Sequence, residues 1–301
     1  CAHGGPPTFF DPYQIHNLAP RRKGEYLPDR LVDEVIQFID QAAGNTGTSD
    51  QANKAGGRAP FFVTLWNYTV HWPMEAPADL VKKYTTRLGP GIKDARYAAM
   101  IEAMDRSYQR LFKFLDEKRL TDNTLVIFTS DNGAFGGVAD SRPLRAAKGY
   151  LYEGGIRVPL IIRWPNGAKR RGVVDNPVIT MDLHATIRDA AGVDKTPSLD
   201  GRSLNPLLRN EEFTDSPLFF HYPCYAWHRD NQLGSAIREG DYKLIEWLGD
   251  SQLELYNLRE DIGERKNLAE TKPDLARKLH GQLVDWRVDV KAAMPTQKPA
   301  R

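Results

Sequence analysis

The stretch that decides the fold is Thr124-Leu125-Val126-Ile127-Phe128-Thr129-Ser130-Asp131-Asn132-Gly133, near the middle of the 301-residue chain. Its first half is a short apolar run, which is typical of a strand buried on both faces of a sheet. Its second half is polar and ends in glycine, so we expect the strand to stop there in a tight turn. In open α/β sheets, ligands bind beyond the carboxyl ends of the strands. The stretch therefore predicts a site at this strand end.

Helical and strand patterns around this stretch predict an α/β fold. Residues 94–115 carry apolar side chains three and four positions apart, which indicates an amphipathic helix, and the apolar run at residues 61–66 predicts a buried strand before it. A strand, a helix and a strand in this order form a βαβ unit. Similar patterns predict helices at residues 29–40 and 181–191 and a strand at residues 158–163. We expect a mixed, largely parallel sheet flanked by helices.

After about residue 210 the pattern changes to closely spaced short strands separated by turn residues, which favours an antiparallel meander. The four expected strands are residues 218–222, 235–238, 242–247 and 253–256. A last helix begins near Thr271-Lys272-Pro273, since a Pro suits the first turn of a helix. We therefore predict an α/β catalytic domain over residues 1–210 and a small antiparallel subdomain with a terminal helix over residues 211–301.

Composition excludes several classes of protein. The chain has 41 basic and 39 acidic residues, a net charge of +2, which argues against nucleic-acid binding through a broad basic face. No apolar run approaches the roughly 18 residues that a membrane span needs. Two cysteines, Cys1 and Cys224, cannot make a disulfide framework or a structural zinc site. We expect no nucleic-acid partner and no membrane span.

Asp131 and Asn132 are the candidate metal ligands. A carboxylate beside a carboxamide supplies hard oxygen donors, which suit Ca²⁺ or Mg²⁺ rather than a soft metal. Side chains of adjacent strand residues point to opposite faces, so the two could converge only where the strand has ended. The alternative is that Asp131-Asn132-Gly133 is a turn with no further role.

Three further side chains are candidates for binding or catalysis, each with a plain structural alternative. His71 follows the 61–66 run and could bind an anion or protonate a leaving group, or be simply a packed or surface residue. Lys148 suits an oxyanion of a sulfate or phosphate, or is a solvated lysine in a basic loop. His221 opens an aromatic-rich stretch that ends at His228, and could bind a sugar or aryl group or pack between domains.

In their order and spacing these segments resemble the type I sulfatases of the alkaline phosphatase superfamily, over nearly the whole chain. The segments that carry the resemblance are Gly24-Glu25-Tyr26-Leu27-Pro28-Asp29-Arg30, His71-Trp72-Pro73, residues 97–120, Phe128-Thr129-Ser130-Asp131-Asn132-Gly133, Lys148-Gly149, Glu153-Gly154-Gly155-Ile156-Arg157-Val158-Pro159, Asp200-Gly201-Arg202-Ser203-Leu204, Ala236-Ile237-Arg238-Glu239-Gly240-Asp241-Tyr242-Lys243-Leu244-Ile245 and Glu254-Leu255-Tyr256-Asn257-Leu258.

The resemblance implies that Asp131 and Asn132 ligate calcium, with Mg²⁺ possible, and that Lys148 contacts the sulfate and the ester oxygen. It implies that His71 lies near the sulfate and the leaving group as a proton donor. The implied activity is hydrolysis of a sulfuric ester, with release of inorganic sulfate from a sulfated small molecule or a sulfated polysaccharide. The implied location is periplasmic or extracellular.

The chain departs from the family pattern at the nucleophile. The family uses a formylglycine made from the first residue of a C/S-x-P-x-R motif, but Cys1 is followed by His3 and Gly5 at the required positions, and Cys224 fails in the same way. An early Asp-Asp pair and an upstream Lys and His also have no counterpart. We expect the formylglycine upstream of Cys1, so that the 301 residues alone are inactive.

Two rival functions remain open from the sequence. One is a phosphodiester or phosphonate hydrolase of the same superfamily, although the neutral Asn132 lowers the negative charge of the site and so favours a sulfate ester. The other is a non-catalytic relative that binds a carbohydrate or a protein partner and has lost the nucleophile.

Overall fold

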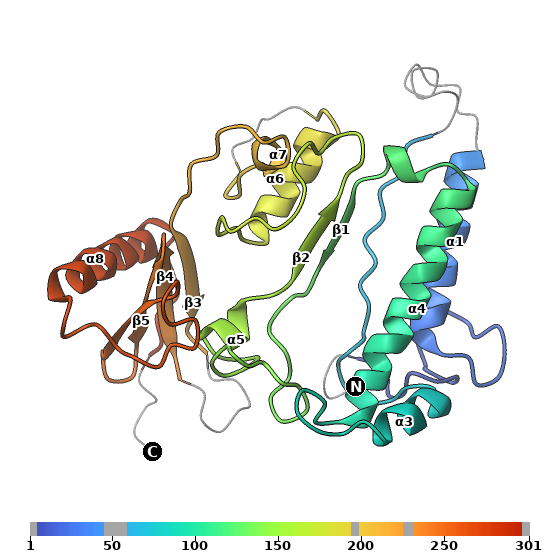
Figure 1. The fold of residues 1–301 in the computed structure, drawn as a ribbon, viewed down its shortest axis with the longest axis horizontal. Coiled ribbons are helices and arrows are strands. Elements are labelled where there is room, and N and C mark those ends of the chain that lie inside the picture. The colour runs from blue at the N-terminus through green and yellow to red at the C-terminus, as the bar shows by residue number, and fades with distance from the viewer. Residues whose placement is uncertain (1–4, 45–58, 194–198, 225–231, 297–301) are drawn as a thin grey trace. The chain divides into compact units, whose positions relative to one another are not determined.

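A computed structural model describes residues 5–44, 59–193, 199–224 and 232–296 of the chain (Figure 1). The chain divides into two compact units, the first made of Cys1–Asp122 with Gly137–Asp140 and the second of Asn123–Gly136 with Ser141–Arg301. Helices and strands both occur, so the predicted α/β class is confirmed. The domain boundary at residue 210 does not coincide with this division and stays a prediction. No helix among the described ranges is both long enough and apolar enough to cross a membrane.

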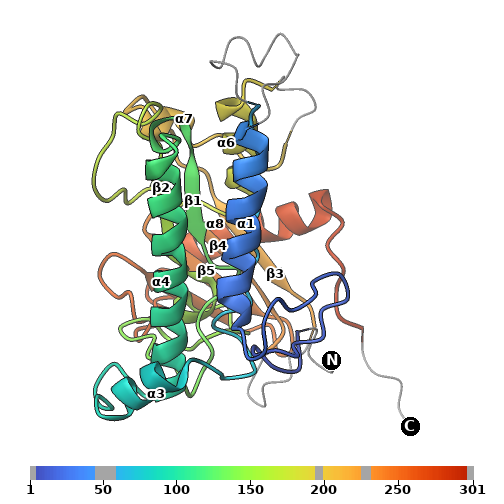
Figure 2. The ribbon, with the colours of Figure 1, turned by 90° about the vertical axis from the view of Figure 1, so that its right-hand side faces the viewer.

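The first unit is helical. It contains α1 (Leu27–Gly44), α3 (Ala78–Thr85) and α4 (Ala95–Glu117), and α4 is followed by the short helix η1 (Thr121–Asn123). Helices α1 and α4 lie side by side (Figure 2). Asp94 is the N-cap of α4: its carboxylate accepts hydrogen bonds from the backbone amides of Arg96 and Tyr97. Both predicted helices of this region are confirmed.

The buried face of α4 differs from the apolar stripe that the sequence suggests. Ala99, Ala103 and Ser107 are buried, whereas Ile101 of the predicted stripe is 43% exposed. The hydroxyl of Ser107 donates to Asp29 Oδ1 of α1 at 2.5 Å. Small side chains let the two helices approach closely, and this close approach places the contact on a neighbouring face of α4.

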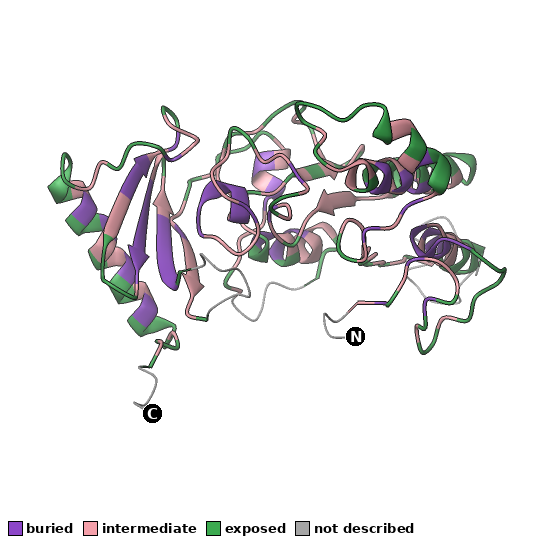
Figure 3. Ribbon diagram, turned by 90° about the horizontal axis from the view of Figure 1, so that it is seen from below, coloured by how far each residue is buried: buried purple, intermediate pink, exposed green. Residues whose placement is uncertain are grey.

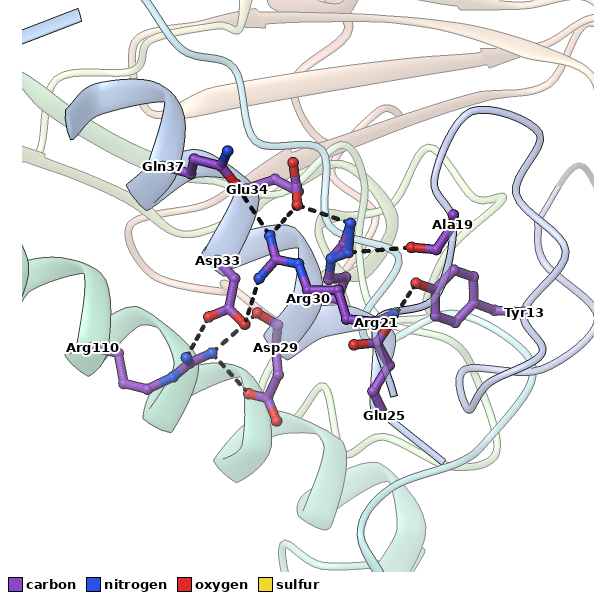
Figure 4. Close-up of polar contacts among 10 residues, drawn as sticks. All are labelled: Tyr13, Ala19, Arg21, Glu25, Asp29, Arg30, Asp33, Glu34, Gln37 and Arg110. Atoms are coloured by element: carbon purple, nitrogen blue, oxygen red, sulfur yellow. Dashed lines mark hydrogen bonds and ion pairs between the residues drawn. The ribbon is translucent and has the colours of Figure 1, made fainter. Parts of the chain in front are cut away.

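Charged side chains line the contact between α1 and α4 (Figure 4). Arg110 of α4 reaches Asp33 of α1 at 2.5 Å, and Arg30 reaches Glu34 at 2.9 Å. Arg21, which precedes α1, contacts both of these carboxylates. Most of these side chains are a third or more exposed, so we expect each pair to add little stability.

The strand predicted at residues 61–66 is wrong: the structure assigns no strand there. Phe61, Val63 and Leu65 pack into an apolar cluster with α1 and α4. Phe62 and Trp66 point the other way and are 69% and 84% exposed. A strand-like composition indicates only that a segment suits a half-buried surface. A strand also needs a hydrogen-bonded neighbour, and no described segment pairs with residues 61–66.

The second unit begins with two paired strands. Strand β1 (Val126–Thr129) and strand β2 (Leu160–Arg163) pair antiparallel, with Val126 opposite Arg163 and Thr129 opposite Leu160. Both strands lie where the sequence predicts them. The segment between them holds α5 (Glu153–Ile156), a single helical turn, and reverses the chain direction instead of crossing over the sheet. Strand pairing is therefore antiparallel wherever the structure describes it, and the parallel character of the sheet is not confirmed.

The remainder of the second unit matches the predicted meander. Strands β3 (Leu218–Tyr222), β4 (Gly234–Glu239), β5 (Tyr242–Trp247) and β6 (Leu253–Asn257) form one antiparallel sheet in this order, preceded by α6 (Met181–Ala190) and α7 (Asn205–Leu208). The middle strands β4 and β5 are the most buried (Figure 3). Helix α8 (Pro273–Asp289) packs Leu279 and Leu283 against the sheet, and both side chains are fully buried.

Candidate functional site

The candidate site is centred on the turn that follows β1. Strand β1 ends at Thr129, and the Ser130 hydroxyl donates to the backbone oxygen of Asn132 at 3.0 Å, which closes the turn. The Asn132 carboxamide donates to the Asp131 carboxylate, so the two side chains lie against each other. Asp131 is exposed and Asn132 is half-buried. The end of the strand therefore brings these two side chains together, and their role as metal ligands stays a prediction.

Gly133 allows this turn to contact α5. Its backbone amide donates to the Gly155 oxygen at 2.9 Å. A Cβ atom at position 133 would lie 1.9 Å from the Gly154 oxygen, which is far inside any real contact. A glycine is required here because two backbone segments meet.

Lys148 is attached to the same turn through its backbone. The Lys148 amide donates to the Ala134 oxygen at 2.9 Å, and the Gly154 amide donates to the Arg145 oxygen at 2.8 Å. Lys148 is half-buried, and no described residue forms an ion pair with its ammonium group. These backbone hydrogen bonds join the segments that carry Asp131, Asn132 and Lys148.

The two predicted histidines belong to other segments of the chain. His71 belongs to the first unit, where it is exposed and its Nδ1 lies 3.3 Å from the backbone oxygen of Trp72. Its convergence with Asp131 stays a prediction. His221 lies on β3, with Nδ1 2.8 Å from Ser235 Oγ and Nε2 2.7 Å from the Ala293 oxygen. Both of its ring nitrogens thus have partners within the chain. The rest of its aromatic stretch, from residue 225 to His228, lies outside the described residues.

The donor chemistry of the turn fits a hard divalent cation. Ca²⁺ takes about six to eight oxygen ligands, from carboxylates, carboxamides and backbone carbonyls. Asp131 and Asn132 supply a carboxylate and a carboxamide oxygen on adjacent residues. In the described ranges, no group of three or more His, Cys, Asp or Glu residues is placed to hold a metal ion. Asp131 and Asn132 could therefore supply some of the oxygen ligands of such a cation.

A buried ionic cluster lies next to the site and was not predicted from the sequence. The Lys243 ammonium lies between the carboxylates of Glu153 and Glu264, and all three side chains are buried. Burial raises the pKa of the Glu264 carboxyl above its ordinary value, although the charge of Lys243 opposes this rise. The signal that could have revealed the cluster is a lysine in the middle of the apolar strand Tyr242-Lys243-Leu244-Ile245.

Three arginines line a cavity in the same unit. The cavity has a volume of about 380 Å³, and its lining residues are Arg142, Pro143, Leu144, Arg145, Gly263, Glu264 and Arg265. The guanidinium of Arg145 stacks 3.8 Å from the centre of the Tyr152 ring and donates to the Tyr256 hydroxyl at 3.0 Å. These contacts fix one face of the cavity. Such a cavity suits an anionic group.

Comparisons with known proteins show which family the chain resembles. The sulfatase family model matches residues 5–193, and a model described as the C-terminal part of N-sulphoglucosamine sulphohydrolase matches residues 146–289. A sulfatase of Formosa agariphila is 33% identical over 292 residues, which cover 88% of this chain and 50% of the relative. Human steryl-sulfatase is 32% identical over 223 residues, covering 68% of this chain and 34% of the relative.

A solved structure, that of Ps i-CgsB in complex with k-i-k-neocarrahexaose, is similar with a TM-score of 0.74 and 27% identity, covering 90% of this chain and 57% of that chain. The chain spans about half the length of the first curated relatives it matches. These relatives support the sulfatase prediction over the phosphodiester or phosphonate alternative. With a family match over more than half of its length, the chain belongs to the sulfatase family.

Proposed function

We propose that the whole protein hydrolyses sulfuric esters, with the turn after β1 and Lys148 forming one part of its active site. The observation that carries this proposal is the backbone connection between them. Hydrogen bonds through Ala134 and Gly155 hold two hard oxygen donors on one segment and Lys148 on the adjoining one, and the Lys148 ammonium pairs with no carboxylate in the described part of the chain. A site of this kind can hold a cation and an oxyanion together.

The chemistry follows from how charge develops during sulfuryl transfer. As in phosphoryl transfer, the transition state is loose, so positioning and nearby positive charge lower its energy. Lys148 would donate to a sulfate oxygen and to the ester oxygen as negative charge builds up there. Asp131 and Asn132 would hold Ca²⁺, or Mg²⁺, which when bound polarises the sulfate oxygens. His71 would give a proton to the departing alcohol. The formylglycine nucleophile would come from upstream of Cys1.

For the substrate we propose a sulfated carbohydrate rather than a small aryl sulfate. The argument is the cavity lined by Arg142, Arg145 and Arg265, because several guanidinium groups suit a substrate that carries more than one anionic group. The similar Ps i-CgsB structure holds a carbohydrate ligand. Such substrates occur outside the cytoplasm, so the protein would act in the periplasm or outside the cell.

The role of Lys148 can be tested by measuring sulfate release in the full-length protein. Lys148→Ala should lower kcat by about a hundredfold or more, which is typical for loss of one group that stabilises developing charge. Lys169→Ala, an exposed lysine of the same unit, is the matched control and should keep wild-type turnover. A Lys148→Ala enzyme with near-wild-type kcat would refute this role. Sulfate release by the 301-residue chain alone would refute the proposal that the nucleophile lies upstream.

The substrate class can be tested with the same assay. Arg142→Ala with Arg265→Ala should raise KM for a polysulfated oligosaccharide and leave KM for a monosulfated aryl ester unchanged. An equal effect on both substrates would show that the cavity does not select polyanions.

A further inference from the structure

A buried charge cluster attaches α5 to the small sheet, and the proposed chemistry makes no use of it. The Lys243 Nζ atom on β5 lies 3.0 Å from Glu153 Oε1 and 2.8 Å from Glu264 Oε1. The other Glu264 oxygen accepts a hydrogen bond from the Glu153 backbone amide at 2.7 Å. The side chains of Lys243, Glu153 and Glu264 are 1%, 3% and 0% exposed. We refer to these three residues as the Glu153 cluster.

Stability alone is a poor reason for such a cluster. Taking charges out of water is costly, and apolar residues of similar volume often stabilise a protein as well or better. The Glu153 cluster moreover places two carboxylates around one ammonium. The only other cation paired with it in the described chain is Arg157, 3.6 Å from Glu153 and 51% exposed, where water screens its charge. The cluster instead fixes the position of Glu153, because it holds both the side chain and the backbone amide of this residue.

The position of Glu153 is passed on to the candidate site by the next two residues. Gly154 donates its amide to the Arg145 oxygen, and Gly155 accepts from the Gly133 amide at 2.9 Å. Gly133 adjoins Asn132, and the neighbouring Ala134 accepts the amide of Lys148. No space separates these backbones, since a single Cβ at Gly133, Gly154 or Gly155 would lie within 2.3 Å of a carbonyl oxygen. A shift of α5 would therefore move the turn that carries Asp131 and Asn132.

We propose that Glu153, Lys243 and Glu264 are positioning residues that hold α5, and through it the Asp131–Asn132 turn and the Lys148 backbone, in the arrangement used for catalysis. The reference to catalysis rests on the function proposed above, whereas the mechanical connection does not. In this proposal none of the three side chains acts on the substrate: Glu264 also lies in the lining of the arginine cavity, but its side chain is 0% exposed. The small sheet thereby sets the geometry of a site that it does not itself line.

Hydrogen exchange in the 301-residue chain tests the connection directly. Lys243→Met leaves two buried carboxylates without their counter-charge, so α5 should loosen, and the amides of Gly133 and Lys148 should exchange at least about tenfold faster. The control is Arg287→Met, which breaks another buried ion pair, that of Arg287 on α8 with Glu246 on β5 at 2.6 Å. In the control these two amides should exchange as in the wild type. Equal exchange in both variants, or no protection of the two amides in the wild type, would overturn the proposal.

A pair of substitutions at position 264 separates positioning from simple stabilisation and serves where Lys243→Met does not fold. Glu264→Leu removes the acceptor of the Glu153 amide and leaves the Lys243–Glu153 pair neutral overall, so exchange at Gly133 and Lys148 should again increase. Glu264→Gln keeps one oxygen that can accept from the Glu153 amide, although its nitrogen then faces the Lys243 ammonium, so protection should be clearly higher than in the Leu variant. If the Leu and Gln variants behave alike, the hydrogen bond to Glu153 does not position α5.

Turnover of the full-length protein completes the test. Lys243→Met should lower kcat by about 10- to 100-fold, as loss of a residue supporting a metal ligand typically does, and Arg287→Met should not. If exchange responds as expected but no form of the protein releases sulfate, the positioning role stands and the proposed function fails. If the wild type releases sulfate and neither exchange nor kcat responds to Lys243→Met, the positioning role alone fails.

Discussion

Replacing Gly133 with alanine tests the close contact between the turn after β1 and α5. The added Cβ would lie 1.9 Å from the Gly154 oxygen, 2.8 Å from the Gly154 carbonyl carbon and 2.9 Å from the Gly155 Cα. All three atoms belong to the backbone, so no side chain can rotate away to make room. To reach ordinary contact at 3.4 Å the carbonyl oxygen must move by about 1.5 Å, and overpacking of this kind forces the backbone to shift. That movement would also stretch the hydrogen bond from the Gly133 amide to the Gly155 oxygen.

The cost can be worked from these two effects. Overpacking a close contact costs about 1–3 kcal/mol, and losing one buried hydrogen bond costs about 1 kcal/mol more. The sum, roughly 2–4 kcal/mol, is a large part of the 5–15 kcal/mol by which a typical protein is stable. For a unit of this size each 1 kcal/mol lowers the unfolding midpoint by about 2–4 °C. The expected midpoint for Gly133→Ala is therefore at least about 4 °C below that of the wild type.

The assay is thermal unfolding of the 301-residue chain followed by circular dichroism. Gly136→Ala is the matched control in the same loop, since its Cβ would meet only the Ala147 Cβ at 3.4 Å, an ordinary contact. We expect the midpoint of this control to stay within about 2 °C of the wild type, as for a substitution that creates no clash. If Gly133→Ala has the same unfolding midpoint as the control, the two backbones do not approach as described. The proposed link between α5 and the site is then refuted as well.

Three further predictions concern pH, the core and the surface. Burial raises the pKa of Glu25, but hydrogen bonds, first the one from Tyr13 at 2.7 Å, outweigh it and leave that pKa lowered. The stabilisation by ionised Glu25 is therefore present above the ordinary pKa of 4.5 and is lost as the pH falls through the lower pKa of the folded state. Tyr13→Phe should make the thermal midpoint fall less steeply with decreasing pH. Identical slopes in the variant and the wild type would contradict this. Leu283→Ala should lower the free energy of unfolding in urea by about 2–5 kcal/mol, and the partly exposed Val284→Ala by clearly less; similar losses would mean that α8 packs on another face. Arg110→Ala should cost less than about 1 kcal/mol in the same assay despite its two carboxylate contacts, because the side chain is 45% exposed, and a loss above 2 kcal/mol would show a cooperative network.

Features that depend on neighbours along the chain follow from local sequence patterns. The apolar run before Thr129 marks β1, and the closely spaced strands after residue 210 form the predicted meander. The side-by-side placement of Asp131 and Asn132 needs only the end of a strand and a turn, so it too is predictable. In each case a few consecutive residues contain all the information, because backbone geometry and side-chain periodicity act over that range.

Features that depend on distant partners were decided by the folded chain. The 61–66 run has the composition of a strand, but no described segment pairs with it. The buried face of α4 is set by the small residues, such as Ser107, that let α1 approach. Lys243 lies 90 residues from Glu153, so no local pattern indicates that their side chains meet. Strand pairing and the burial of charged side chains depend on contacts between residues that are far apart in the sequence. Only folding brings these residues together.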